Sequence, residues 1–453
     1  MRPPLTPGLA RDLLAARPPG GATPAVELCL LDFLACAFAA RDSRPSRAAQ
    51  AMALAEPGEA TILGLSRRAA PGAAAFANAA AGHGLVREDM HAGANSHFGV
   101  VLLPTLLALA QQRRVSGTAF IEAAAVGYEV GARLGRVMVN PRFSRQWRPT
   151  GWTGPLAAVA AGARLLGLAP EQAASALSLA ANIAGGLNEW PRDGGDEMFF
   201  HPGFGARNAL VVLALAAGGA EGSAMALDGP AGLIAAAGAE PPAGLPLFDG
   251  ATAEVELVFR KALPLCNFAQ TPAQAALCLL RQAGALDPAS IAGITVRASE
   301  AAVRYPGCDG QGPFQRVLQA KMSIAFCVAA ALLHGAVEEQ HFALPASPEL
   351  MRLVALVRLE IDPAATAAFP ACQPAEVIVT LADGRRLAAA MPDLEPADEV
   401  TVRRRFAEAA GAALGEGRGG QLGEALAGLP DVADLGAALR LAEAPGGEAA
   451  PRS

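Results

Sequence analysis

Three of the six histidines of this chain, His83, His91 and His97, fall within one stretch of fifteen residues. The same stretch carries the charged run 87–89, and its neighbours are almost entirely Ala, Gly, Leu and Val. Polar groups in such an apolar context are costly to bury unless they are paired. The clustering therefore predicts a functional site.

Each residue of this stretch has a functional and a structural interpretation. His97 is predicted to be a general acid or base, because imidazole titrates near neutral pH, although it could instead cap a buried helix end. His91 is a weaker catalytic candidate that could simply face solvent. Asp89 either supports a catalytic histidine, whose pKa it would raise, or pairs with Arg87, which is also a candidate substrate-binding residue. His83 ends an Ala-rich segment, where a protonated ring would suit the helix dipole, so a structural role is favoured.

A second group of candidates precedes a predicted helix. In the run that begins at Arg148, Thr153 could cap the helix and Pro155 suits its first turn. The free backbone N–H groups of such a helix start attract anions. Arg148 and Thr150 are therefore predicted to bind an anionic substrate, and a plain capped helix with a surface arginine is the alternative.

Three further residues could bind or convert an anion. Between His201 and Arg207 the glycines permit close backbone approach, which suits either substrate binding or domain packing. Lys261 and Lys321 are the only lysines beside 34 arginines. The pKa of an ammonium group can be tuned, which is not true of a guanidinium group, so Lys261 is a predicted catalytic residue unless it is a surface remnant.

Metal and dinucleotide chemistry are not favoured by the spacing. The three histidines are separated by eight and six residues, and no His-Glu-x-x-His is present. Gly93 and Gly99 do not form the Gly-x-Gly-x-x-Gly pattern of a dinucleotide-binding loop. We expect no metal and no organic cofactor.

Composition limits the class of protein. The net charge is -6 without a basic block, which argues against a nucleic-acid partner. Apolar runs are interrupted before they reach the roughly 18 residues that cross a bilayer, so we expect a soluble protein with no membrane partner. No secretory signal is visible and the seven cysteines are scattered without a Cys-x-x-Cys pair, so a cytoplasmic location with reduced thiols is expected.

The hydrophobic period indicates the elements that must position these residues. Apolar residues at three and four spacing predict helices over 26–40, 70–81, 104–112, 119–137, 155–168, 170–183 and 206–217. From about residue 250 the period changes. Strands are predicted over 291–298 and 353–361, a hairpin over 376–390 with its turn at Asp383-Gly384, and helices over 272–283 and 321–333. Helical periodicity returns over 399–441.

The fold class predicted is therefore mainly α with a smaller α+β domain. A large all-helical domain would be formed by both chain ends, residues 1–250 and 396–445, with an α+β lid over 251–395 inserted between them.

An ordered series of motifs carries a resemblance to a known family. The histidine stretch is followed by Gly127-Tyr-Glu-Val-Gly131, Arg148-Pro-Thr-Gly151-Trp-Thr-Gly154, His201-Pro-Gly203-Phe-Gly-Ala-Arg207 and Lys261-Ala-Leu-Pro264-Leu-Cys266. In this order the motifs resemble the MmgE/PrpD family, which includes 2-methylcitrate dehydratase, cis-aconitate decarboxylase and an iminodisuccinate epimerase. The resemblance spans about residues 10–440. It implies a helical domain with an inserted lid, a homodimer, and no required metal or organic cofactor.

The resemblance also implies the chemistry of the site. Family substrates are small acids with two or three carboxylates, so Arg148, His201, Arg207 and Lys261 become predicted carboxylate holders, and Cys266 takes a position in the family pocket. A buried inert thiol is the alternative for Cys266. The predicted function is a cofactor-independent lyase, a dehydratase or decarboxylase, that abstracts a proton next to a carboxylate with His97 as acid or base and Asp89 as its support.

Four positions depart from the family pattern: Val86, Arg148, Met198 and Phe326 stand where acidic, histidine, lysine and tyrosine residues are usual. These departures weaken the case for citrate-type dehydration in particular. They leave two alternatives open, an isomerase or epimerase of a small dicarboxylate and a non-catalytic carboxylate-binding homologue.

Overall fold

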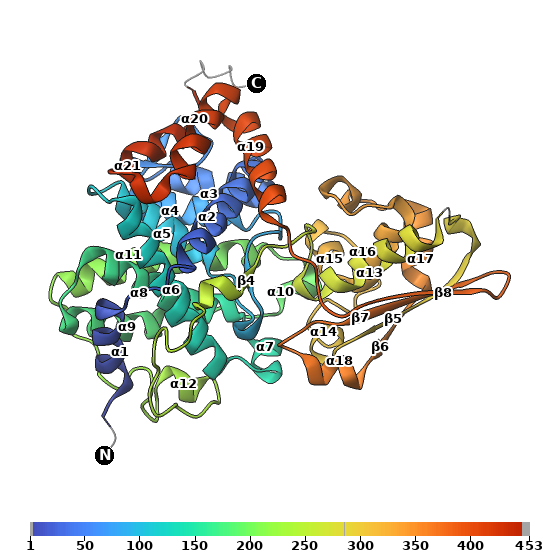
Figure 1. Cartoon of the computed structure of the whole chain (residues 1–453), viewed down its shortest axis with the longest axis horizontal. Coiled ribbons are helices and arrows are strands. Elements are labelled where there is room, and N and C mark those ends of the chain that lie inside the picture. The colour runs from blue at the N-terminus through green and yellow to red at the C-terminus, as the bar shows by residue number, and fades with distance from the viewer. Residues whose placement is uncertain (1–2, 285, 446–453) are drawn as a thin grey trace.

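The computed structural model describes residues 3–284 and 286–445. Figure 1 shows a large helical body and, beside it, a smaller lobe that contains the main sheet. Two hydrophobic cores correspond to these lobes. The larger core combines residues from 5 to 258 with residues from 397 to 442, and the second core is built mostly from residues 265 to 391. The protein is thus mainly α with a small sheet region, and the exact domain boundaries of the sequence analysis stay predictions.

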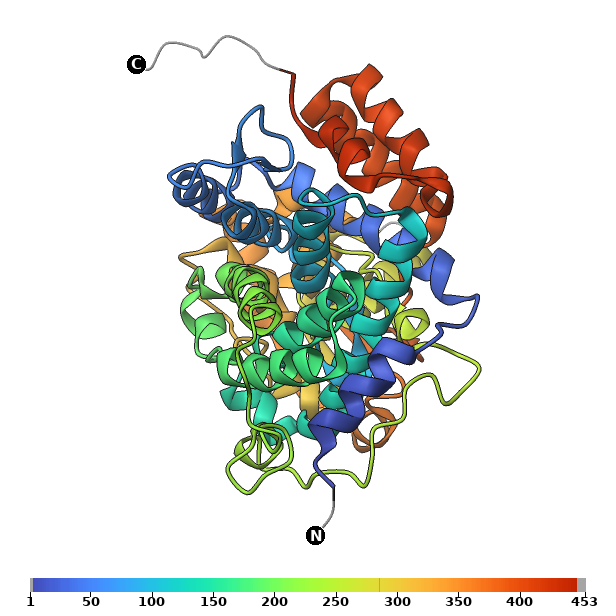
Figure 2. The ribbon, with the colours of Figure 1, turned by 90° about the vertical axis from the view of Figure 1, so that its left-hand side faces the viewer.

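The body is made of helices from both ends of the chain, and Figure 2 shows the last helices packed over the first ones. They are α1 (Leu5–Ala15), α2 (Ala22–Ala39), α3 (Arg44–Ala53), α4 (Pro71–Gly82), α5 (Gly99–Ala110), α6 (Gly117–Met138), α7 (Pro141–Gln146), α8 (Pro149–Leu166), α9 (Pro170–Ile183), α10 (Trp190–Asp193), α11 (Glu197–Ala217), α12 (Leu233–Ala236), α19 (Glu399–Leu414), α20 (Glu416–Ala427) and α21 (Leu435–Ala438). All seven helices predicted in this half of the chain are confirmed in type.

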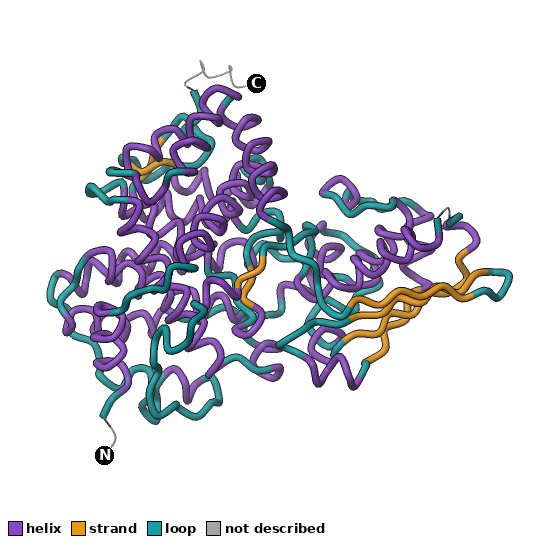
Figure 3. Tube along the Cα trace, viewed as in Figure 1, coloured by secondary structure: helices purple, strands orange, loops and turns teal. Residues whose placement is uncertain are grey.

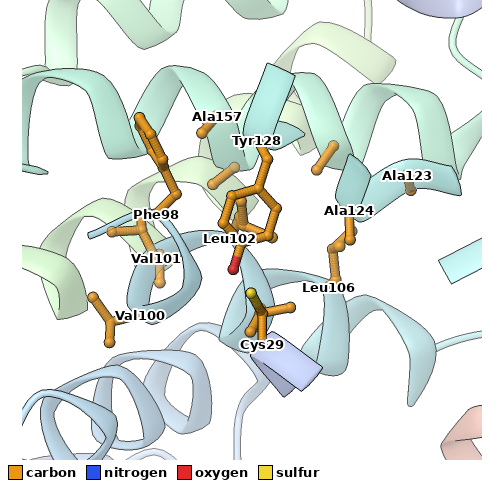
Figure 4. Packing of buried hydrophobic residues seen from close by; sticks show 14 of the residues in the cluster. Cys29, Phe98, Val100, Val101, Leu102, Leu106, Ala123, Ala124, Tyr128 and Ala157 are labelled. Carbon is orange, nitrogen blue, oxygen red and sulfur yellow. The ribbon is translucent and has the colours of Figure 1, made fainter. Parts of the chain in front are cut away.

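Small residues bring the helices at the centre of the body close together. A Cβ added to Gly127 of α6 would lie 2.8 Å from the backbone oxygen of Ala157 in α8, and one added to Gly131 would lie 2.7 Å from the Ala157 Cβ. Figure 4 shows Tyr128, between these two glycines, packed among Phe98, Leu102 and Cys29 with its hydroxyl pointing away from α6. This packing fixes α5, α6 and α8 as a rigid base for the segment that contains the histidines.

Helix starts differ from the prediction at two important places. α8 begins at Pro149, six residues before the predicted start, so Thr153 lies inside it and does not cap it. Its hydroxyl instead donates to the backbone oxygen of Pro149. α5 begins at Gly99, and Pro104 lies in its interior. Both corrections place the candidate residues His97 and Arg148 immediately before a helix.

The smaller lobe contains a four-stranded sheet of order β6-β5-β7-β8. β5 (Ile291–Ala298) pairs in parallel with β6 (Val357–Ile361) and antiparallel with β7 (Ala375–Leu381), which forms a hairpin with β8 (Arg386–Met391). The tube in Figure 3 shows this sheet as the main strand region of the molecule. The lobe's helices are α13 (Asn267–Ala283), α14 (Glu300–Val303), α15 (Val317–Met322), α16 (Ile324–His334), α17 (Pro348–Leu356) and α18 (Pro363–Ala368).

The predicted hairpin and the strand at 291–298 are confirmed, but the strand predicted over 353–361 is wrong in its first half. Residues up to Leu356 are helical, because Ser347 caps α17 through the Leu350 N–H and Pro348 occupies the first turn. Leu350, Leu353 and Val354 are buried at helical spacing, which a short apolar run cannot distinguish from a strand.

Short strand pairs connect distant segments. β1 (Ala60–Thr61) pairs with β2 (Arg68–Ala69) inside the body. β3 (Met90–His91) pairs with β4 (Val258–Phe259), where the chain leaves the body for the smaller lobe. The second pair places the histidine stretch beside the start of that lobe.

Two helices, α2 and α11, are long and apolar enough to span a membrane by length and composition alone. In their most apolar windows, 67% and 50% of the residues are buried inside the protein. Helices in the core of a folded domain have the same properties, so these two carry little weight as membrane spans.

A buried charge cluster fixes the β3–β4 junction and contains His91. The His91 Nδ1 accepts from the Ala94 N–H, so the proton is on Nε2, which donates to Glu254 over 2.8 Å. Arg136 donates to the same carboxylate over 2.9 Å. Burial alone would raise the pKa of Glu254, but hydrogen bonds from His91 and Arg136 lower it to about 2. His91 is therefore a structural residue here, neither solvent-exposed nor in the cavity described below.

We predict that Glu254→Gln lowers the free energy of unfolding by about 2 kcal/mol at neutral pH, since Arg136 and His91 lose their anion. The pKa of Glu254 is lower in the folded chain than its ordinary value of 4.5. Its contribution is therefore complete above about pH 4.5 and is lost as the pH falls toward 2. Urea unfolding of both proteins at pH 7 and at about pH 3.5 measures this, and the difference between them should shrink in acid. An unchanged difference at both pH values would contradict the assignment.

Candidate active site

Four of the predicted site residues, His97, Arg148, Lys261 and Cys266, line one small cavity between the two lobes. The body contributes His97 and Arg148, and the smaller lobe and its entry strand contribute Lys261, Cys266 and Tyr305. The cavity has a volume of about 20 Å³, which is room for a single water molecule. Each of these five residues is at most 5% exposed, so the groups that line the cavity have little contact with bulk solvent.

Glu88 is the charged centre of the site, and the sequence analysis did not select it. Its Oε1 lies 2.9 Å from His83 Nδ1, 3.2 Å from His97 Nδ1 and 3.5 Å from Lys261 Nζ. Burial would raise the pKa of this carboxyl, but its contact with His83 and the charge of Lys261 hold it well below its ordinary value. Glu88 is therefore a buried carboxylate that is paired with Lys261.

His97 has the geometry of a neutral base. Its Nδ1 lies 2.7 Å from the backbone oxygen of Asp89. A carbonyl only accepts, so Nδ1 carries the ring proton and Nε2 has a free lone pair. Burial and the charge of Lys261 hold the pKa of His97 well below its ordinary value, so the ring is neutral at physiological pH. The hydroxyl of Thr150 accepts a hydrogen bond from the His97 backbone N–H over 3.1 Å, which fixes the position of the His97 backbone.

Asp89 supports His97 in a way that the sequence did not predict. Its backbone orients the ring, while its side chain accepts from the Tyr128 hydroxyl over 2.5 Å and from the Gly99 N–H over 3.3 Å. A Cβ at position 99 would lie 2.5 Å from the Asp89 carboxylate, so only glycine leaves room for this approach. Burial raises the pKa of Asp89 to about 6. Asp89 therefore acts as an anchor of the loop.

Arg148 is a buried cation without an anion. One of its nitrogens lies 3.1 Å from His83 Nε2 and another 3.5 Å from the Tyr305 hydroxyl, and the guanidinium stacks 5.2 Å from the centre of the Trp190 ring. Among residues 3–284 and 286–445, no carboxylate lies within ion-pair distance of Arg148. A buried guanidinium in this state is a strong binding site for a carboxylate.

Two histidines neighbour Arg148. Because Arg148 can only donate, His83 Nε2 is unprotonated and its proton is on Nδ1, facing Glu88. His83 directly follows α4, and burial lowers its pKa while Glu88 opposes that lowering. Burial and the charge of Arg148 lower the pKa of His201 to about 4. His201 lies next to Arg148, across Gly186, but does not line the cavity.

The chain's two lysines hold consecutive carbonyl groups of one loop. Lys261 Nζ donates to the backbone oxygen of Val86 over 3.0 Å, and Lys321 Nζ donates to that of Leu85 over 2.9 Å while it pairs with Glu339 at 2.6 Å. Val86 has a φ of 58°, a conformation that is strained for a β-branched residue. The smaller lobe thus holds the loop that carries Glu88 in a strained shape.

Other predicted residues are placed away from the cavity. Arg207, on α11, pairs with Glu56 at 3.0 Å on the body, so the structure does not bring it to the site. Arg87 does not pair with Asp89; it lies near Asp32, whose pKa burial raises to about 7 while Arg87 opposes that rise. Both arginines became candidates because of the residues next to them in the sequence. Their side chains instead contact Glu56 and Asp32, away from the cavity.

Tyr305 was missed for a different reason. It comes from a turn after α14 that has no recognisable motif, yet its hydroxyl links Arg148 to Asn188, 3.5 Å away. Glu88 and His83, in contrast, lie inside the histidine stretch. Their closeness to His97 in the sequence was a signal that could have identified them as site residues.

A larger hollow of about 380 Å³ adjoins the cavity and shares Asn95, Phe268 and Tyr305 with it. Its other walls come from α7 and from α14 and α18, which face one another in Figure 1. Arg145 and Arg304 also line it.

The fold and the site together define a mainly helical protein of two lobes with a small cavity between them that is lined by Arg148 and Lys261. Comparison with known proteins agrees. Residues 10–245 match the MmgE/PrpD N-terminal domain and residues 263–395 match the MmgE/PrpD C-terminal domain. The chain belongs to the MmgE/PrpD family.

Curated relatives include two fungal proteins. The chain is 36% identical over 209 residues to the cis-aconitate decarboxylase-like protein oryM of Aspergillus oryzae and 34% identical over 200 residues to the cis-aconitate decarboxylase of Aspergillus terreus. These matches cover 44% and 42% of this chain, and 43% and 41% of the two relatives. The similarity thus spans less than half of each relative.

We predict that His97 stays neutral, with its proton on Nδ1, between about pH 6 and 8. Nitrogen NMR of the histidine-labelled protein measures both the protonation and the tautomer, and a His97→Gln variant assigns the signal. His201, whose pKa is about 4, should likewise remain neutral in this range. A His97 signal that titrates near 6.5, or a proton on Nε2, would contradict this description.

Proposed function

We propose that this chain is a lyase that acts on a small di- or tricarboxylic acid, by loss of carbon dioxide or water next to a carboxylate. One observation carries the proposal: the unpaired guanidinium of Arg148 shares a small cavity with the neutral base His97 and the ammonium group of Lys261. Arg148 and Tyr305 would hold one carboxylate of the substrate. A second carboxylate would lie near Lys261.

Either lyase reaction can be written with these groups. In dehydration, His97 Nε2 takes the proton from the carbon next to a carboxylate, and the hydroxyl on the neighbouring carbon leaves as water after it receives a proton from Lys261. In decarboxylation, a carbon–carbon bond breaks, carbon dioxide leaves, and the electron pair moves to the remaining carbon framework. A proton from Lys261 then completes the product. Both reactions develop negative charge beside Arg148 and Lys261, which stabilise it.

Decarboxylation is the first reaction to test, because the names of both fungal relatives refer to cis-aconitate decarboxylase. An isomerase or epimerase is the alternative that the site itself favours, since His97 and Lys261 could remove and return a proton on two sides of one ligand. A homologue that binds carboxylates without turnover is the third possibility. The homodimer, the cytoplasmic location and the independence of metal and organic cofactors stay predictions.

The small volume of the cavity requires an opening step. A tricarboxylic acid is far larger than the single water molecule that the cavity can hold. Substrate would enter through the adjoining hollow beside Tyr305 and Phe268 as the lobes separate. Closure would then remove water and strengthen the charge interactions inside.

We predict that His97→Asn lowers kcat about 10²- to 10⁴-fold with little change in substrate binding, because only the base is lost. We expect Arg148→Lys to weaken binding about 10- to 100-fold, because an ammonium group cannot reproduce the bidentate contact. Citrate, 2-methylcitrate, cis-aconitate and iminodisuccinate are the substrates to assay, with carbon dioxide release, alkene formation and solvent deuterium incorporation as readouts. Arg207→Lys is the matched control, and it should behave as wild type.

Four results would overturn different parts of the proposal. Deuterium incorporation without loss of water or carbon dioxide would identify an isomerase. Saturable binding without turnover of any acid would identify a binding protein. Full activity of His97→Asn on a substrate that the wild type converts would remove His97 from the chemistry. Activity lost on treatment with a chelator would contradict the predicted independence of metal ions.

A further inference from the structure

A pair of thiols lies in the wall of the site. Cys266 Sγ and Cys308 Sγ are 3.8 Å apart, and both residues are buried. Cys266 directly precedes α13, whereas Cys308 lies in the turn region after α14. A disulfide bond has a sulfur–sulfur distance of about 2.05 Å, so a movement of under 2 Å would join them.

The two thiols differ in access and in charge. Cys266 lines the cavity together with Arg148 and Lys261, and Cys308 lies behind it with no exposed surface. A hydrogen bond from Cys308, aided by the charges of Lys261 and Arg148, lowers the pKa of Cys266 in spite of its burial. Burial and the neighbouring Cys266 raise the pKa of Cys308. Because the thiolate is the reactive form, Cys266 is the thiol that reacts first.

The remaining cysteines do not compete. Cys327 is nearby, but its thiol faces the backbone oxygens of Ala320 and Lys321, each 3.7 Å away. Burial raises the pKa of both Cys29 and Cys36, which makes them unreactive. The other two, Cys278 and Cys372, are partly exposed and belong to other parts of the lobe.

We propose that Cys266 and Cys308 form an oxidative modification site, at which a peroxide that enters the cavity joins the two thiols in a reversible disulfide that blocks substrate binding. The proposal stands on the 3.8 Å sulfur–sulfur distance, on the position of Cys266 in the cavity wall, and on the enclosed position of Cys308 behind it. The blocking effect rests on the function proposed above, whereas formation of the disulfide does not.

The chemistry balances with one peroxide per disulfide. The Cys266 thiolate attacks a peroxide oxygen, the oxygen–oxygen bond breaks, and a sulfenic acid and hydroxide form, the latter taking up a proton to give water. The Cys308 sulfur then attacks the sulfenic sulfur, and the hydroxyl group leaves as a second water with the Cys308 proton. The two sulfurs are oxidised together by two electrons, and the peroxide is reduced by two. A dithiol reverses the step by thiol–disulfide exchange.

The disulfide would act on substrate binding through Tyr305. The Cys308 N–H donates to the backbone oxygen of Tyr305 over 3.1 Å, so both belong to one turn. The Tyr305 hydroxyl in turn contacts Arg148. A contraction between Cys266 and Cys308 would therefore move the group that holds Arg148 and would pull Cys266 Sγ out of the cavity wall.

The experiment treats the reduced full-length protein with hydrogen peroxide, alkylates the remaining thiols and maps peptides by mass spectrometry. We expect a cross-linked peptide pair that contains Cys266 and Cys308, with a mass lower by two hydrogen atoms. Citrate affinity, measured by calorimetry, should fall about tenfold or more and return after dithiothreitol. In Cys308→Ser the cross-link should be absent, and Cys266 should be trapped as a sulfenic acid by dimedone. Cys278→Ser is the matched control and should respond as wild type.

Each other outcome overturns a defined part of the proposal. Oxidation of Cys278 or Cys372 while Cys266 and Cys308 stay reduced would exclude the site, as would a Cys266–Cys327 cross-link. A Cys266–Cys308 cross-link with unchanged citrate affinity would exclude the blocking effect. If the cross-link forms but the reduced protein neither binds nor converts any polycarboxylate, the thiol site stands and the proposed lyase function fails.

Discussion

The structure of this site depends on one buried carboxylate, Glu88, that stays ionised between His83, His97 and Lys261. A lone carboxylate in an apolar interior would take up a proton. Here the charge survives because Lys261 reaches it from the smaller lobe, while His83 and His97 face it from the body. The two lobes are thus tied by an ion pair that neither could form alone, and removal of either partner would leave an uncompensated buried charge.

Once Glu88 and Lys261 neutralise each other, Arg148 remains as an unbalanced positive charge. Its neighbours, His83, Tyr305 and Trp190, offer a lone pair, a hydroxyl and a ring face but no negative charge. An anion with more than one carboxylate would satisfy Arg148 and also approach Lys261. Burial makes the unpaired charge of Arg148 energetically unfavourable, and burial also keeps His97 neutral. Burial of the site therefore accounts for both the anion-binding group and the base.

The sequence was sufficient to predict the elements and the identity of the central stretch, because helical and strand periodicity and a cluster of titratable residues are local signals. His97, Arg148 and Lys261 meet as predicted, although they are far apart in the chain. Local signals could not say which way a side chain points: Arg87 and Asp89 are adjacent to Glu88, yet of the three side chains only that of Glu88 contacts His97 and Lys261. Tyr305 and Asn188 have no motif and become visible only when the lobes are packed together.

The short run 353–361 shows that hydrophobic periodicity cannot assign short segments, because its apolar spacing suits both a helix and a strand. The N-cap at Ser347 favours the helix up to Leu356. His91 shows a third limit. A histidine close to an acid in sequence suggested catalysis, but its partners Glu254 and Arg136 are more than a hundred residues away from one another and form a structural cluster.

The central claim, that Arg148 and Lys261 form an unfilled site for a multiply charged acid, is tested most directly by a crystal structure of the protein with citrate bound. The account predicts one citrate carboxylate within hydrogen-bond distance of the Arg148 guanidinium and the Tyr305 hydroxyl, a second near Lys261 Nζ, and a citrate carbon facing His97 Nε2. Citrate bound on an outer surface, with Arg148 still unpaired at saturating concentration, would contradict it.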